Sequence, residues 1–145
     1  MADDKFATFA ALYNEIGQEL GRITGGDPDG TYLYAEVEEG VTGGGVFKDE
    51  GKQVRYYDPS PLLLDLLDDL WHAEDPDKRW RAMEFSVTGN QVHAIFVFPE
   101  DFRSDHSTNE RRQAALKVRY GDKPIIYPPI PDNFMEYKGT FGGSD

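Results

Sequence analysis

The segment Ser60-Pro-Leu-Leu-Leu-Asp-Leu-Leu-Asp-Asp-Leu-Trp-His72 has the clearest helical pattern in the chain. At about 100° per residue, its leucines and its tryptophan fall on one continuous arc of roughly 200°. Ser60 can cap the first turn and Pro61 suits the first helical position. Asp75-Pro76 ends the pattern, because the residue before a proline disfavours helical backbone. The pattern predicts a helix over 62–75 with a broad buried face. The opposite edge carries Asp65, Asp68, Asp69 and His72.

The chain before this helix predicts one longer helix and several strands. Residues 4–24 form an amphipathic pattern with Phe6, Phe9 and Leu12 among the residues of its apolar face, and the turn residues of 25–30 end it. Residues 31–37 alternate in the manner of a strand. We expect the glycine-rich residues 40–45 to be a flexible loop. Two short strands, 46–48 and 53–57, then follow around a tight turn.

The chain after this helix predicts a hairpin, a third helix and an extended arm. Two β-rich runs, 80–88 and 91–98, flank Gly89-Asn90, a strong hairpin signal. The second run is apolar on nearly both sides, which predicts a central place in the sheet. Ser107-Thr-Asn-Glu110 is a capping-box pattern for a helix that continues to about Arg119. The prolines after Lys123 predict an extended arm on the surface.

The order of these elements, α-β-β-β-α-β-β-α, predicts an α+β fold. Because the connections have hairpin length, we expect an antiparallel sheet of about five strands covered by helices. At 145 residues the chain has the size of one domain. We assign residues 1–122 to that domain. The proline-rich arm, 123–145, is either part of it or partly disordered.

The charge is unevenly distributed along the chain. The net charge is −12, and residues 1–75 hold 17 acidic side chains against 5 basic ones, whereas residues 76–145 hold ten of each. Binding to nucleic acid or to an anionic membrane needs a cationic face, so both are disfavoured as direct partners. The acidic excess has two interpretations: it keeps the protein soluble, or it complements a basic protein.

Composition points to a cytoplasmic globular protein. The chain is 39% hydrophobic and has no cysteine, which argues against disorder and excludes disulfides and thiolate metal sites. No apolar run is long enough to span a membrane. The first residues are acidic and lack the apolar core of a signal peptide. We expect neither a transmembrane segment nor a disulfide framework.

No catalytic or cofactor motif is visible in the sequence. His72, His93 and His106 stand apart and form no metal-binding spacing. The run 43–45 lacks the lysine and hydroxyl of a phosphate-binding loop. Asp65, Asp68 and Asp69 lack the geometry of a calcium loop. We therefore expect a non-enzymatic protein without a metal or cofactor, although a small enzyme with a carboxylate site stays as an alternative.

Several strings of the chain resemble the YezG-like immunity proteins, the antitoxins of secreted bacterial toxins. The resemblance covers roughly residues 5–120 and is carried by diffuse apolar and acidic patterns. The matching strings are Ile16-Gly-Gln-Glu-Leu20, Thr31-Tyr-Leu-Tyr-Ala-Glu-Val-Glu-Glu39, Tyr56-Tyr57, Leu70-Trp71, Trp80 with Met83-Glu-Phe-Ser-Val-Thr88, Phe96-Val-Phe98 and Glu110-Arg111-Arg112. Gly43-Gly44-Gly45 and the proline-rich arm depart from the pattern.

The resemblance implies that the protein binds and neutralises a cognate toxin, often a nuclease, inside the producing cell. An acidic protein can occupy or flank the cationic groove of a nuclease. We predict a contact surface formed by Glu36, Glu38, Glu39, Asp65, Asp68 and Asp69. The protein would be a monomer or a homodimer. The alternative from another class is a general interaction or scaffold module that uses the acidic face or the arm.

Overall fold

A computed structural model describes residues 2–128 of the chain, with side chains from residue 4. Within these residues the chain is α+β, as predicted, with two short 3-10 turns between the main elements. The helices are α1 (Ala2–Ile23), α2 (Pro61–Ala73) and α3 (Thr108–Tyr120). The strands are β1 (Thr31–Glu38), β2 (Val41–Asp49), β3 (Val54–Tyr57), β4 (Ala82–Thr88), β5 (Gln91–Val97) and β6 (Ile125–Ile126).

The strands form one six-stranded sheet in the order β5-β4-β1-β2-β3-β6. The β1–β2, β2–β3, β1–β4 and β4–β5 pairs are antiparallel, as predicted. The β3–β6 pair is parallel, so the sheet is mixed. The sixth strand comes from the start of the proline-rich arm, where Lys123 also binds Asp49 at 3.0 Å. The rest of the arm, 129–145, lies outside the described residues.

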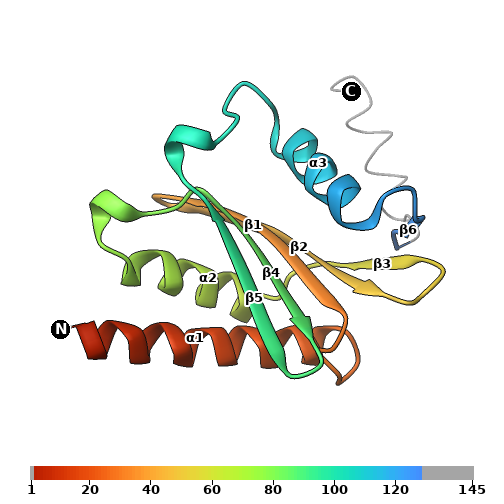
Figure 1. The fold of residues 1–145 in the computed structure, drawn as a ribbon, viewed down its shortest axis with the longest axis horizontal. Coiled ribbons are helices and arrows are strands. Elements are labelled where there is room, and N and C mark those ends of the chain that lie inside the picture. The colour runs from red at the N-terminus through yellow and green to blue at the C-terminus, as the bar shows by residue number, and fades with distance from the viewer. Residues whose placement is uncertain (1, 129–145) are drawn as a thin grey trace, which may run out of the picture.

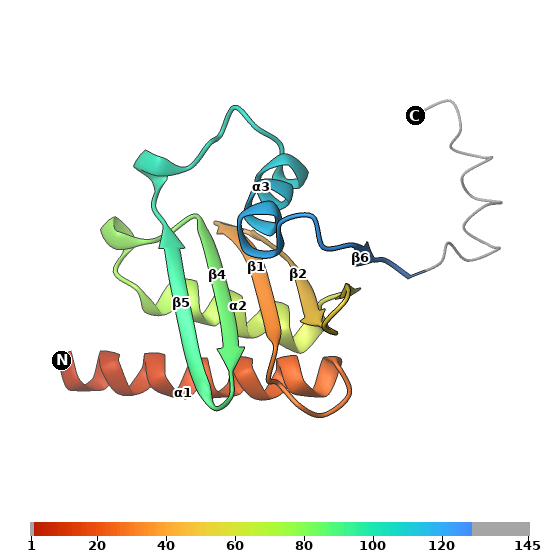
Figure 2. The same cartoon turned by 45° about the vertical axis from the view of Figure 1, so that its right-hand side comes forward.

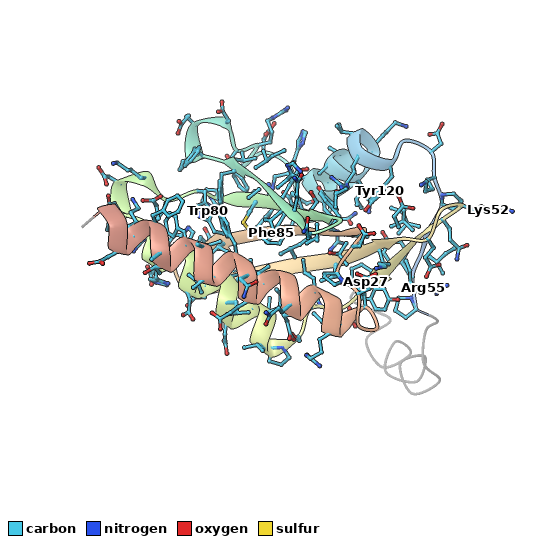
Figure 3. All side chains as sticks on the ribbon, turned by 60° about the horizontal axis from the view of Figure 1, so that its bottom comes forward. Asp27, Lys52, Arg55, Trp80, Phe85 and Tyr120 are labelled. Atoms are coloured by element: carbon cyan, nitrogen blue, oxygen red, sulfur yellow. The ribbon has the colours of Figure 1, made fainter. Side chains whose placement is uncertain are left out.

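The molecule has three layers: α1 and α2 cover one face of the sheet and α3 covers part of the other (Figures 1 and 2). Alternation along β1 directs Leu33, Ala35 and Val37 toward α1 and α2, into the larger core. Tyr32 and Tyr34 point the opposite way and pack with Leu116 of α3. Figure 3 shows Phe85 between α1 and the sheet, and Tyr120 on the far side at α3.

Local signals set the ends of α2 and α3. The Ser60 hydroxyl accepts the N–H of Leu63 at 3.0 Å, and the capping box of Ser107 and Glu110 is complete. The α2 helix ends at Ala73, because Glu74 already has extended backbone. The indole N–H of Trp71 then donates to the carbonyl of Trp80 at 2.7 Å, which fastens α2 to the segment leading into β4.

Three sequence predictions about particular segments are wrong. The strand predicted to be central, β5, is an edge strand, and Ile95 is 60% exposed on it. Residues 40–45 do not form a loop, since the chain turns within Glu39-Gly40 and β2 already begins at Val41. Phe6, which the pattern places on the buried face of α1, is 76% exposed. The first turns of α1 project beyond β5, so the sheet does not cover them (Figure 2).

Candidate functional site

The acidic edge of α2 faces away from the core. Asp65 and Asp69 are exposed and Asp68 is half-exposed, because the opposite arc of the helix carries the buried leucines. Among the described side chains, no lysine or arginine lies within ion-pair distance of these three carboxylates. The helix therefore presents a row of negative charge that its own surroundings do not neutralise.

A histidine joins this row to the β1–β2 turn. His72 Nδ1 lies 2.9 Å from the main-chain carbonyl of Asp68 and 3.4 Å from its carboxylate. His72 Nε2 lies 3.6 Å from the carboxylate of Glu39 in the turn. The hydrogen bond to the Asp68 carbonyl raises the pKa of His72, and the charges of Asp68 and Glu39 act in the same direction. The turn and the helix thus share one charge cluster.

Glu38 belongs to the opposite side of the sheet from α2. Its carboxylate lies 3.4 Å from a guanidinium nitrogen of Arg81, and about half of the side chain remains exposed. Because side chains alternate along a strand, Glu38 points to the α3 side, whereas Val37 points into the core against α1 and α2. Glu38 therefore lies at the rim of the acidic row and not within it.

Glu36 is an internal residue. Its carboxylate accepts hydrogen bonds from Arg111 Nε at 2.7 Å, from the Tyr34 hydroxyl at 2.6 Å and from the Thr108 hydroxyl at 2.8 Å. Only 11% of the side chain is exposed. Burial opposes its ionisation, but the bonds from Arg111, Tyr34 and Thr108 outweigh burial and lower the pKa of Glu36. The Glu36 carboxylate therefore holds α3 against β1 and is not available to a partner protein.

The predicted contact residues thus separate into two groups. We call the solvent-accessible group the acidic surface; it consists of Glu39, Asp65, Asp69 and the half-exposed Asp68, with Glu38 at its rim. Glu36 stands apart from it in the interior. Sequence reasoning missed the linking role of His72, although its spacing of four residues from Asp68 is a helical-neighbour signal. It also missed the Glu36–Arg111 pair, for which residues 75 positions apart carry no local signal.

A second surface feature lies between α3 and the β4–β5 half of the sheet. It is an open cavity of about 320 Å³, lined by Phe102, Val97, Ala114, Val118 and other residues. Arg111 and His106 supply polar groups at its margin. Val118 is 90% exposed beside it, and Ile95 on β5 is also exposed. Contiguous exposed apolar patches are typical of protein contacts, whereas single exposed apolar side chains are ordinary.

The described part of the chain offers no metal site and no membrane helix. No group of three or more histidine, cysteine or acidic side chains in residues 4–128 has the geometry to hold a metal ion. None of the helices between residues 2 and 128 has both the length and the apolar character needed to cross a bilayer. Comparison with protein-family models and with curated protein sequences finds no match to this chain.

Proposed function

We propose that this protein is an immunity protein that binds and neutralises a cognate secreted toxin of the nuclease class through the acidic surface. The observation that carries the proposal is the row of α2 carboxylates without a lysine or arginine partner among the described side chains, extended by Glu39 to the β1–β2 turn. A basic nuclease domain has the complementary charge, and that charge raises the rate of encounter. The resemblance to YezG-like proteins supports the same partner.

The experiment is co-purification of this protein with the toxin domain encoded beside its gene, followed by a nuclease assay of the complex. We expect a stoichiometric complex that suppresses cleavage and weakens steeply as salt rises, because exposed charges are screened. A complex that forms but leaves cleavage unchanged would contradict neutralisation. Absence of a complex would contradict the proposal as a whole.

Charge reversal tests whether the carboxylates of α2 form the contact with the toxin. The triple variant Asp65→Lys, Asp68→Lys, Asp69→Lys should weaken binding by about 100-fold or more, since it replaces three attractive charges with repulsive ones. The matched control reverses Asp77, Glu100 and Asp122, which are also exposed but lie on other elements. It changes the net charge equally. If both variants lose the same affinity, the effect comes from net charge alone, and the acidic surface is not the contact.

The second candidate function is a protein-interaction module that has no toxin partner. The cavity between α3 and the β4–β5 half of the sheet favours it, because much of its lining is apolar and its charged lining residues include both acids and arginines. Such a module would bind host proteins and give no protection from the neighbouring toxin. Survival of cells that express the toxin with and without this protein distinguishes the two functions.

A further inference from the structure

The first half of β2 has a free edge. β3 pairs with β2 only between Val46 and Asp49 and ends at Tyr57, opposite Val46. The residues Val41–Gly45 pair with β1 on one side, and no strand of residues 2–128 lies on the other. Figure 2 shows this half of β2 extending beyond β3. We call Val41–Gly45 the β2 edge.

The hydrogen-bond alternation shows which main-chain groups the edge presents. The Val37 N–H donates to the Arg81 carbonyl on the β4 side at 3.0 Å, so its neighbour Glu36 directs its main-chain groups to Gly43 on β2. The groups of Thr42 and Gly44 consequently point away from β1. Since β3 has ended by this point, it supplies them with no partner. The edge offers two N–H donors and two carbonyl acceptors to an added strand.

Packing explains why two of the three glycines in the β2 edge lack a side chain, but it does not explain the third. A Cβ on Gly44 would lie 3.1 Å from the Tyr34 carbonyl, and one on Gly45 would lie 3.0 Å from the Tyr56 ring. A side chain at either position would therefore require the neighbouring atoms to shift. A Cβ on Gly43 would meet nothing within 4 Å. Glycine weakens a strand, and its presence there without a packing reason is typical of a place that another backbone approaches.

On the α2 side, the charges along the edge are those of the acidic surface, whereas on the α3 side Arg112 lies against Gly45 at the far end of the edge. Glu38 and Glu39 lie at its start, in the hairpin that opens β2. The contact between His72 and Glu39 shows that the side of α2 carrying His72 faces this hairpin. Asp68 and Asp65 lie on the same line as His72, four and seven residues earlier. An extended segment along the edge would therefore run beside carboxylates, which favours lysine or arginine in that segment.

We propose that the β2 edge accepts an extended basic segment of the toxin domain as an added strand. This inference rests on the proposed immunity function and specifies how the partner docks. The main chain of the segment bonds to Thr42 and Gly44, and its cations face Asp65 and Asp68. Main-chain pairing supplies affinity in such complexes, while the flanking side chains supply specificity. A second copy of this chain is a poor occupant, because it would bring the same negative charges together.

The first test removes one outward donor. The variant Thr42→Pro lacks the N–H that points to the free edge, and proline is tolerated where a strand N–H faces solvent. The control Thr42→Val keeps this N–H and the shape of the side chain. With the toxin domain encoded beside the gene, Thr42→Pro should bind about tenfold more weakly, whereas Thr42→Val should bind as the original protein does. Equal affinities of the two variants would overturn the inference.

The second test needs no substitution. Amide hydrogen exchange is followed by NMR in the original protein, free and bound to the same toxin domain. The amides of Thr42 and Gly44 should become protected on binding, by about tenfold or more. Protection of β5 amides instead of Thr42 and Gly44 would overturn the inference. Protection of Thr42 and Gly44 that rises with the concentration of the free protein would also overturn it, because it would indicate pairing between two copies of this chain. Absence of any complex would overturn the proposed function and this inference together, whereas a complex with both amides unprotected overturns the inference alone.

Discussion

Glu36 on β1 and Arg111 on α3, 75 positions apart in the sequence, form an ion pair with two hydrogen bonds. Arg111 Nε donates to one carboxylate oxygen at 2.7 Å and Nη2 donates to the other at 3.0 Å. The two side chains are 11% and 13% exposed, and the Arg111 guanidinium also lies 4.1 Å from the centre of the Phe102 ring. The pair fastens α3 to the sheet, next to the hairpin that carries part of the acidic surface.

Removing Arg111 should destabilise the fold strongly. Arg111→Met leaves the Glu36 carboxylate nearly buried without its cation, at a cost of about 3 kcal/mol in the free energy of unfolding. The control Arg103→Met breaks an exposed pair with Asp105 and should change the free energy of unfolding little, because solvent screens exposed ion pairs. Urea unfolding followed by circular dichroism measures both. Equal unfolding midpoints for the two variants would show that the Glu36–Arg111 pair contributes little.

Stability should fall in acid partly because of Glu36. Its pKa is below the ordinary value of 4.5 in the fold, so its contribution is full above that pH and is lost as the pH falls through the lowered value. Glu36→Gln should therefore flatten the dependence of the urea midpoint on pH below about 4.5. Thr108→Val, which removes one neutral donor to Glu36, should flatten it less. Parallel pH curves for the original protein and Glu36→Gln would contradict this assignment.

His72 should titrate above its ordinary value of 6.5. Because the pKa of His72 is raised in the fold, its charge interaction with Asp68 and Glu39 contributes fully to stability below pH 6.5. This contribution is lost as the pH rises through the raised pKa. An NMR titration of the imidazole ring measures this pKa. Glu39→Gln should lower it, since one of the nearby negative charges is removed. The control Asp77→Asn, on another segment, should leave the pKa of His72 unchanged. An equal shift of this pKa in both variants would contradict the contact between His72 of α2 and Glu39 of the turn.

Alanine should affect stability differently at two neighbouring glycines of β2. Gly44→Ala places a Cβ 3.1 Å from the Tyr34 carbonyl and should cost about 1–3 kcal/mol. Gly43→Ala meets nothing within 4 Å and should be neutral or add about 0.5 kcal/mol, because alanine restricts the unfolded chain. Thermal and urea unfolding measure both changes. A loss of stability at Gly43 equal to that at Gly44 would contradict the described course of β2.

The signals that sequence reading interpreted correctly act over a few residues. The Ser60 cap, the capping box of Ser107 and the Gly89-Asn90 hairpin each depend on bonds within about four positions, so residue identity is enough to predict them. Residues 40–45 misled the same reasoning. Their glycines are typical of a loop, but pairing with β1 holds them in a strand, since neighbouring strands override local preference.

The order of the strands and the position of each carboxylate were decided only by tertiary structure. The apolar pattern of β5 is the same for a central strand and for an edge strand, and the neighbours that distinguish them are distant in sequence. Glu36 and Glu38 both lie on the α3 side of β1, yet α3 covers only Glu36. Sequence alone determined the three helices, the Gly89-Asn90 hairpin and the acidic excess, because these depend on local spacing and composition. Which acids remain exposed depends on what packs over them.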